Sequence, residues 1–178
     1  MTDGRRYVSP RSRAKRTLEL LNLHPPGSYP WQSTSASQST SQSTSTSACA
    51  ARVEVTDDVR EWDYGAYEGI TSAEIRSRRG DPAWDIWRDG CPDGGENPAD
   101  VIARLDRVIA DIRARWHRPA MEQVVQKHKH DESHTTGGDV MVVAHGHILR
   151  ALALRWCGRA LHDGPAFLLE AGGVGILR

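Results

Sequence analysis

The sequence predicts an α/β fold of three layers, α/β/α, in which helices cover both faces of a mainly parallel sheet. The first observation is the apolar run Val140–Ala144, which lacks polar alternation and is typical of a strand covered on both faces. The second is the helical pattern that starts directly after this run and continues to Trp156. The third is that further short strand and helix patterns alternate along the chain, as in parallel sheets.

In the N-terminal third, two short strands and one helix are predicted. Arg6–Val8 is a candidate strand, and the residues after Pro10 repeat with helical spacing. We expect the buried face of this helix to carry Ala14, Leu18 and Leu21. Val53 and Val55 alternate with polar residues, which predicts a second short strand.

Farther along, helix signals are stronger. Thr71 and Glu74 have the spacing of a capping box, and Asn97 followed by Pro98 is typical of a helix start. The apolar face of the helix after Asn97 is predicted to hold Val101, Leu105, Val108, Ile112 and Trp116. After the apolar run, Ile148, Leu149, Leu152 and Trp156 should face inward. Two last strands are expected at Phe167–Leu169 and Val174–Leu177.

Two segments look poor in buried structure. Gln32 to Ser47 is nearly all Ser, Thr and Gln, so we expect a disordered insertion over residues 32–48 of a single domain, 1–178. Residues 117–139 carry His128, His130 and His134 among polar residues. A solvated loop is favoured there over a metal site, because no carboxylate or cysteine stands at ligand spacing.

Composition limits the class of partner and compartment. Lys plus Arg and Asp plus Glu each total 23, so no net field favours nucleic acid or an anionic membrane. The three cysteines are scattered and form neither a disulfide framework nor a zinc ligand set. No apolar run reaches the roughly 20 residues of a membrane span. We therefore expect a cytoplasmic protein with a small-molecule ligand; the oligomeric state is open.

A histidine and a glycine end the apolar run, at the sheet edge where α/β proteins bind ligands. His145 would lie at the carboxyl end of the strand, and Gly146 would let an anion approach the N-terminus of the next helix. His145 could instead be a hydrogen-bonded core histidine. A metal pair with His147 is disfavoured, because barrel hydrolases of that type need about 250 residues and more ligands.

Five motifs in order resemble the histidine phosphatase superfamily, with the phosphoglycerate mutase-like fold. They are "SPRSRAKRTLELL" (Ser9–Leu21), "DDVREWDYGAYEGITSAEIR" (Asp57–Arg76), "WDIWRDGCPDGGEN" (Trp84–Asn97), "VMVVAHGHILRAL" (Val140–Leu152) and "FLLEAGGVGIL" (Phe167–Leu177). They are most similar to the fungal sedoheptulose-1,7-bisphosphatase branch. The resemblance implies hydrolysis of a phosphorylated sugar through a phosphohistidine, with neither metal nor cofactor.

The resemblance also assigns roles. It implies that Arg13 clamps the phosphoryl group, for which the planar guanidinium fork is suited. Glu61 is implied as proton donor to the leaving sugar oxygen, and His145 as the histidine that stabilises the transferred group. Tyr64 and Arg88 are implied substrate contacts, while Gly146 provides backbone approach to the phosphate.

Each assignment has a structural alternative. Arg13 and Arg88 could be ordinary solvated charges, and Tyr64 could pack under its loop. Glu61 could be a loop carboxylate paired with Arg60. His147 could merely line the site.

One family signature is absent from the 178 residues: the Arg-His-Gly that ends the family's first strand and carries the nucleophile. We therefore expect this chain to lack that strand, to be inactive, and to expose strand edges that make it marginally stable or prone to aggregate. The favoured interpretation is that the complete protein is an active phosphatase. A non-catalytic phosphate-binding protein and a phosphoglycerate mutase-type phosphotransferase are the alternatives.

Overall fold

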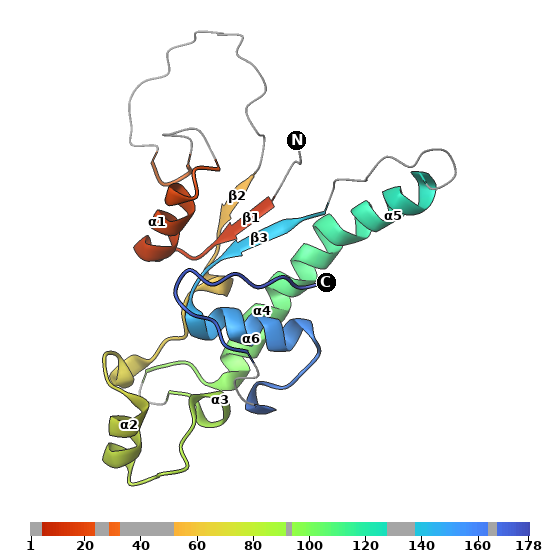
Figure 1. Cartoon of the computed structure of the whole chain (residues 1–178). Helices are drawn as coiled ribbons and strands as arrows, with labels where there is room; N and C mark the ends of the chain where they lie inside the picture. Colours follow the sequence, from red (N-terminus) through yellow and green to blue (C-terminus); the bar gives the residue numbers. More distant parts are fainter. Residues whose placement is uncertain (1–4, 24–28, 33–51, 92–93, 128–137, 164–166) are drawn as a thin grey trace. The chain divides into compact units, whose positions relative to one another are not determined.

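A computed structural model describes residues 5–23, 29–32, 52–91, 94–127, 138–163 and 167–178 (Figure 1). The chain forms two compact units. The first contains residues 1–57 and 111–143, and the second contains residues 58–110 and 144–178. The insertion expected over residues 32–48 and the histidines at 128, 130 and 134 fall outside the described residues, apart from Gln32.

The first unit is built on a three-stranded parallel sheet. Its strands are β1 (Arg5–Val8), β2 (Val53–Val55) and β3 (Val140–Val143), in the order β2-β1-β3. Arg6 of β1 lies opposite Val53 on one side and Met141 on the other. The strands predicted at residues 6–8 and 53–55 are therefore confirmed, and the sheet is parallel as expected.

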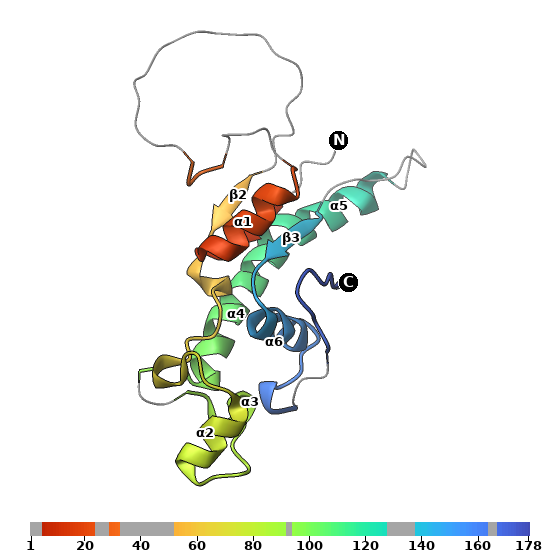
Figure 2. The same cartoon turned by 60° about the vertical axis from the view of Figure 1, so that its left-hand side comes forward.

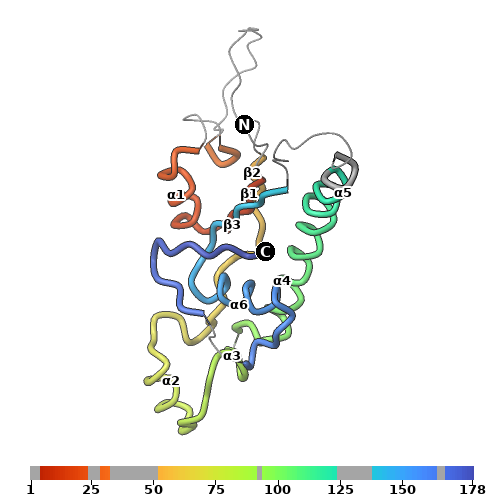
Figure 3. The backbone as a smooth tube through the Cα atoms, turned by 45° about the vertical axis from the view of Figure 1, so that its right-hand side comes forward, coloured from red at the N-terminus to blue at the C-terminus, as the bar shows by residue number. Residues whose placement is uncertain are grey.

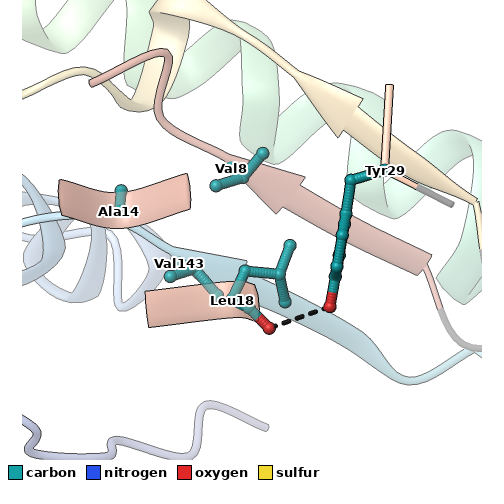
Figure 4. Close-up of a cluster of buried hydrophobic side chains, with 5 residues drawn as sticks. All are labelled: Val8, Ala14, Leu18, Tyr29 and Val143. Carbon is teal, nitrogen blue, oxygen red and sulfur yellow. Dashed lines mark hydrogen bonds between the residues drawn. The ribbon is translucent and has the colours of Figure 1, made fainter. Parts of the chain in front are cut away.

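Helix α1 (Ser12–Leu20) covers one face of this sheet, as Figure 2 shows. Val8 and Val143 of the sheet pack against Ala14 and Leu18 of the helix (Figure 4). Tyr29 completes this cluster, and its hydroxyl donates a 3.0 Å hydrogen bond to the carbonyl of Leu18. Only three residues, Ser9, Pro10 and Arg11, separate the strand from the helix with which it forms this small core.

Leu21 is not part of that core, contrary to the predicted helical face. It is 47% exposed. The helix ends at Leu20, and Asn22 adopts a φ of 51°, so the backbone turns away before Leu21 can follow the helical repeat.

The other side of β1 carries Tyr7. Its hydroxyl donates a hydrogen bond to Asp111 and accepts one from the indole N–H of Trp116 at 3.0 Å. Both partners lie where helix α4 (Pro98–Ile112) runs into a π-helical segment, Arg113–His117. Side chains of β1 therefore alternate between α1 on one face and this helical run on the other, as strand geometry requires.

The helical run does not stop at His117. Helix α5 (Arg118–Lys127) continues it, and Figure 3 follows the backbone through both helices. The prediction of a polar loop over residues 117–139 is thus wrong for its first half. Pro119 is the second residue of α5 and lies directly after the π-helical segment.

Strand β3 is less covered than its sequence predicts. Met141 is 39% exposed, and of the four residues only Val143 is buried. The reason is its place at the edge of the sheet: within the described part of the chain, β1 is the only strand paired with it. An apolar run without alternation therefore did not mean burial on both faces here.

The second unit is mainly helical. It contains most of α4, with α2 (Ser72–Arg79), α3 (Ile86–Asp89) and α6 (Gly146–Trp156). The predicted capping box of α2 is present, and the Asn97 side chain accepts from the backbone N–H of Ala99 at 2.8 Å and of Asp100 at 3.1 Å. Its interior includes Trp62, Trp84, Cys91, Leu105, Ile148 and Leu154.

Helix α6 is tied to α4 by a two-pronged ion pair. The Arg155 guanidinium donates to both carboxylate oxygens of Asp106, each at 2.9 Å. After α6, the structure describes no strand in residues 167–178, where two were predicted. Leu168, Val174 and Ile176 are 95%, 88% and 79% exposed, so these residues lack the neighbouring strand that would make a ladder.

Across the described helices, none combines the length and apolar character of a bilayer span.

Candidate functional site

The loop that carries Glu61 is fixed by a buried ion pair beneath it. Arg104 of α4 donates to both oxygens of Glu96, at 2.9 and 3.0 Å, and to the backbone carbonyls of Asp58 and Arg60, at 2.9 Å each. Glu96 also accepts from the backbone N–H of Asp63 at 2.9 Å. One guanidinium and one carboxylate thereby hold both flanks of Glu61.

Glu96 is charged despite its burial. Desolvation raises the pKa of its carboxyl group, but the hydrogen bonds from Arg104 and from the backbone of Asp63 outweigh that effect, and the net pKa lies below its usual value. Arg60 also donates to Glu96, at 3.1 Å. The alternative in which Glu61 is a loop carboxylate paired with Arg60 is therefore wrong.

Glu61 instead lies at the N-terminus of α6. Its Oε1 accepts from the backbone N–H of Ile148 at 3.0 Å and from that of Trp62 at 3.1 Å, and its Oε2 lies 3.4 Å from the N–H of His147. Glu61 is buried, with 8% of the residue exposed. A negative group is favourable here, because the first N–H groups of a helix have no partner within the helix.

His145 and Gly146 form the entry to the same helix. His145 is buried, has extended backbone angles and immediately precedes α6, as predicted for the end of β3. Gly146 is exposed, and among the described residues a methyl group added there would meet no atom within 4 Å. The backbone at the first residue of α6 is therefore open to an approaching ligand.

Tyr64 and His147 are joined side by side in this site. The Tyr64 hydroxyl oxygen and Nδ1 of His147 lie 2.7 Å apart, with the two rings edge to face at 5.8 Å. The imidazole of His147 also contacts Trp87, with 5.6 Å between the ring centroids. Tyr64 therefore does more than pack under its loop, because its hydroxyl group makes this polar contact with His147.

His147 is held neutral by its surroundings. Burial lowers the pKa of its imidazole, and the nearby Arg150 guanidinium lowers it further, while Glu61 and Asp85 act in the opposite direction more weakly. A neutral imidazole has one nitrogen that accepts and one that donates. The site therefore contains a carboxyl group, a neutral imidazole and a phenol around one helix terminus.

Arg88 and Arg13 stand differently. Arg88, on α3, donates to Asp89 at 2.6 and 2.8 Å and to the carbonyl of Ala83 at 2.6 Å, and its side chain is 54% exposed. Arg13 lies on α1 in the first unit and is exposed. Their roles as phosphate and substrate contacts stay predictions, whereas Glu61, Tyr64, Gly146 and His147 are brought together within the second unit.

Three residues of this arrangement were missed from the sequence: Glu96, Arg104 and Trp87. Arg104 had a usable signal, because it interrupts the apolar face of α4 between Val101 and Leu105, where a charged residue must find a buried partner. No group of three His, Cys, Asp or Glu side chains suited to a metal ion occurs in the described ranges.

Comparison with known proteins shows what this arrangement is similar to. The chain is 34% identical to sedoheptulose 1,7-bisphosphatase of Saccharomyces cerevisiae over an alignment of 209 residues. This alignment covers 96% of this chain and 66% of the yeast protein. It is 37% identical over 123 residues to an acid phosphatase of Mycobacterium tuberculosis, covering 69% of this chain and 50% of that protein. This chain thus spans half to about two thirds of these relatives.

A solved structure agrees. The product of an open reading frame of Mycobacterium tuberculosis matches with a TM-score of 0.57 and 30% identity, over 93% of this chain and 61% of that chain. The sequence model of the histidine phosphatase superfamily (branch 1) matches residues 29–178, which include Glu61, Tyr64 and His145. Because the match spans most of the sequence and the fold is the α/β fold of these relatives, the chain belongs to the histidine phosphatase superfamily.

Proposed function

We propose that the complete protein is a phosphomonoester hydrolase of phosphorylated sugars, of the sedoheptulose bisphosphate class, that works through a phosphohistidine. The observation that supports this most is the convergence of Glu61, Tyr64 and His147 on the N-terminus of α6, next to His145. The yeast relative, a sedoheptulose bisphosphatase, supports the sugar class.

In this proposal each group has one task. Arg13 and His145 balance the negative charge of the phosphoryl group, which in many other phosphatases falls to a metal ion. Glu61 gives a proton to the leaving sugar oxygen, so that the sugar departs as a neutral alcohol. The attacking histidine of the family's Arg-His-Gly has no counterpart among these 178 residues.

Binding tests the proposal directly. Isothermal titration calorimetry with orthophosphate and with sedoheptulose 7-phosphate should give measurable affinity for this chain. His145→Gln should weaken both ligands, since it removes the imidazole beside α6. The matched control is His162→Gln, whose side chain is 69% exposed, and it should change neither affinity. Failure of the unsubstituted chain to bind either ligand would contradict the proposal.

A second candidate is a phosphate-binding protein without turnover, with which the open backbone at Gly146 is compatible. Both candidates predict that this chain releases no phosphate from sedoheptulose 1,7-bisphosphate above a buffer blank. They differ in the transcript upstream of Met1: an in-frame strand ending in Arg-His-Gly supports the hydrolase, and an in-frame stop supports the binding protein.

A further inference from the structure

The Tyr64–His147 contact is built as a rigid unit. His147 is fixed by Tyr64 on one side and by Trp87 on another, and Trp87 is only 4% exposed. Trp87 is itself held edge to face by Trp62, at 5.8 Å. The 2.7 Å contact between the phenol oxygen and Nδ1 is thus set by packing rather than by a side chain free to rotate.

The chemistry of the two groups decides which one donates. A phenol is a better proton donor than a neutral imidazole N–H, since its ordinary pKa is about 10, and an unprotonated imidazole nitrogen is the better acceptor. Burial lowers the pKa of His147 and keeps that acceptor available. The Tyr64 hydroxyl therefore donates to Nδ1, and the imidazole proton resides on Nε2.

We propose that His147 is a positioning residue that engages the single hydroxyl proton of Tyr64, so that Tyr64 can meet a ligand only as a hydrogen-bond acceptor. A hydroxyl group has one proton and two lone pairs, so every further bond at this oxygen must be accepted. The partner it selects is a sugar hydroxyl, which can donate. A phosphate oxygen that is deprotonated near neutral pH cannot. The inference rests on the proposed function, because it takes Tyr64 to be a substrate contact.

The test compares a ligand that has sugar hydroxyls with one that has none. Sedoheptulose 7-phosphate and orthophosphate are titrated into the chain by calorimetry. His147→Phe should weaken the sugar phosphate roughly fivefold, the value of one ordinary hydrogen bond. It should not weaken orthophosphate, because the released Tyr64 proton can donate to a phosphate oxygen. Tyr64→Phe should weaken the sugar phosphate to the same extent, and the double substitution should be no worse than either single one.

Two conservative variants sharpen the result. His147→Asn places an acceptor oxygen near the position of Nδ1 and should restore most of the affinity. His147→Gln carries its amide near Nε2 and should not. Equal losses for both ligands, or additive losses in the double variant, would show that His147 only supports the fold and would overturn the inference.

A measurement without ligand separates this inference from the proposed function. Long-range ¹H–¹⁵N correlation spectra of the imidazoles, assigned with His147→Asn, should show His147 protonated at Nε2 and unprotonated at Nδ1. The Nδ1-protonated form would overturn the inference even if sugar phosphates bind. If the expected tautomer is found but neither ligand binds, the proposed function fails, and with it the role of Tyr64 in reading substrate.

Discussion

Gly146 is the residue at which the site is most open, and this gives a prediction at the scale of one methyl group. Gly146→Ala should lower orthophosphate affinity severalfold, because the new Cβ stands where an anion must approach the first N–H of α6. The melting temperature should not fall, since no described atom lies within 4 Å of that Cβ and Ala favours helix.

The control for this change is Gly175→Ala, at another glycine with no described neighbour around its Cβ. It should alter neither affinity nor melting temperature. Calorimetry and thermal unfolding measure the two properties. If Gly146→Ala kept full phosphate affinity, the anion would not approach along this backbone.

His147 predicts a pH dependence of stability. Because its pKa is lower in the folded chain than the value of about 6.5 in the unfolded chain, the unfolded state binds more protons at acidic pH. The contribution of His147 to the unfolding free energy is complete at pH values above the pKa of the unfolded state. It is lost as the pH falls from that pKa towards the lower pKa of the folded state.

Urea unfolding at pH values between about 7.5 and 5 measures this effect. His147→Asn should make the decline of the unfolding free energy with falling pH less steep. The exposed His162→Asn should leave the slope unchanged. A slope unaffected by His147→Asn would mean that its imidazole has the same proton affinity in both states.

For Glu61, the sequence predicted the residue but not its hydrogen-bond partners. The structural alternative paired it with Arg60, its neighbour in sequence, yet the two side chains have different partners. Arg60 reaches Glu96, 36 positions away, and Glu61 reaches the backbone of Ile148, 87 positions away. The identity of the acid was predictable from its motif; its neighbours were not.

At the scale of elements, the loop that carries Glu61 depends on the Arg104–Glu96 pair. Glu96→Gln should reduce the unfolding free energy by about 3 kcal/mol, because it leaves a buried guanidinium without its countercharge. Asp58→Asn breaks the exposed pair with Arg107, whose side chain is 64% exposed, and should cost under about 1 kcal/mol.

Denaturant unfolding compares the two variants at one pH. Glu96→Gln should lower the orthophosphate affinity of the folded protein only slightly, because Glu96 lies behind the loop that carries Glu61. Similar losses for both variants would show that burial of the pair contributes little.

Helices with strong local signals were predictable from the sequence. For strands, the sequence pattern indicated where one could form but not whether a partner strand was present. The cap at Asn97 and the capping box at Thr71 involve residues two or three apart, so the sequence contains the whole interaction. The strands expected at Phe167–Leu169 and Val174–Leu177 need a partner strand, which no local pattern can supply. Helix α5 was missed because its residues were grouped with the polar, histidine-containing segment that follows it.

For the whole molecule, the edge of β3 and the absence of net charge favour self-association. Formal charges cancel at neutral pH, and Met141 exposes an apolar side chain on an edge strand. Met141→Lys should reduce association in sedimentation velocity at high concentration. Met121→Lys adds the same charge on α5, at a residue 68% exposed, and should have a smaller effect. Equal effects would assign the association to charge alone.

The fold class was predictable because alternation of strands and helices is a property of the whole chain. The division into two compact units was not, since it depends on which distant segments meet. Likewise, the pattern of Val140–Ala144 predicted a strand but could not say how many neighbours it has.

Cys91 lies in the interior of the second unit, 1% exposed, whereas Cys157 is exposed. Burial, with smaller contributions from Asp63 and Glu96, raises the pKa of the Cys91 thiol to about 11, so little reactive thiolate forms in the closed state. Alkylation by iodoacetamide at Cys91 can therefore proceed only when this interior opens. Mass spectrometry of the labelled peptides would compare the alkylation rate of Cys91 with that of the exposed Cys157. The ratio of the two rates would report how often the interior beneath the Glu61 loop opens.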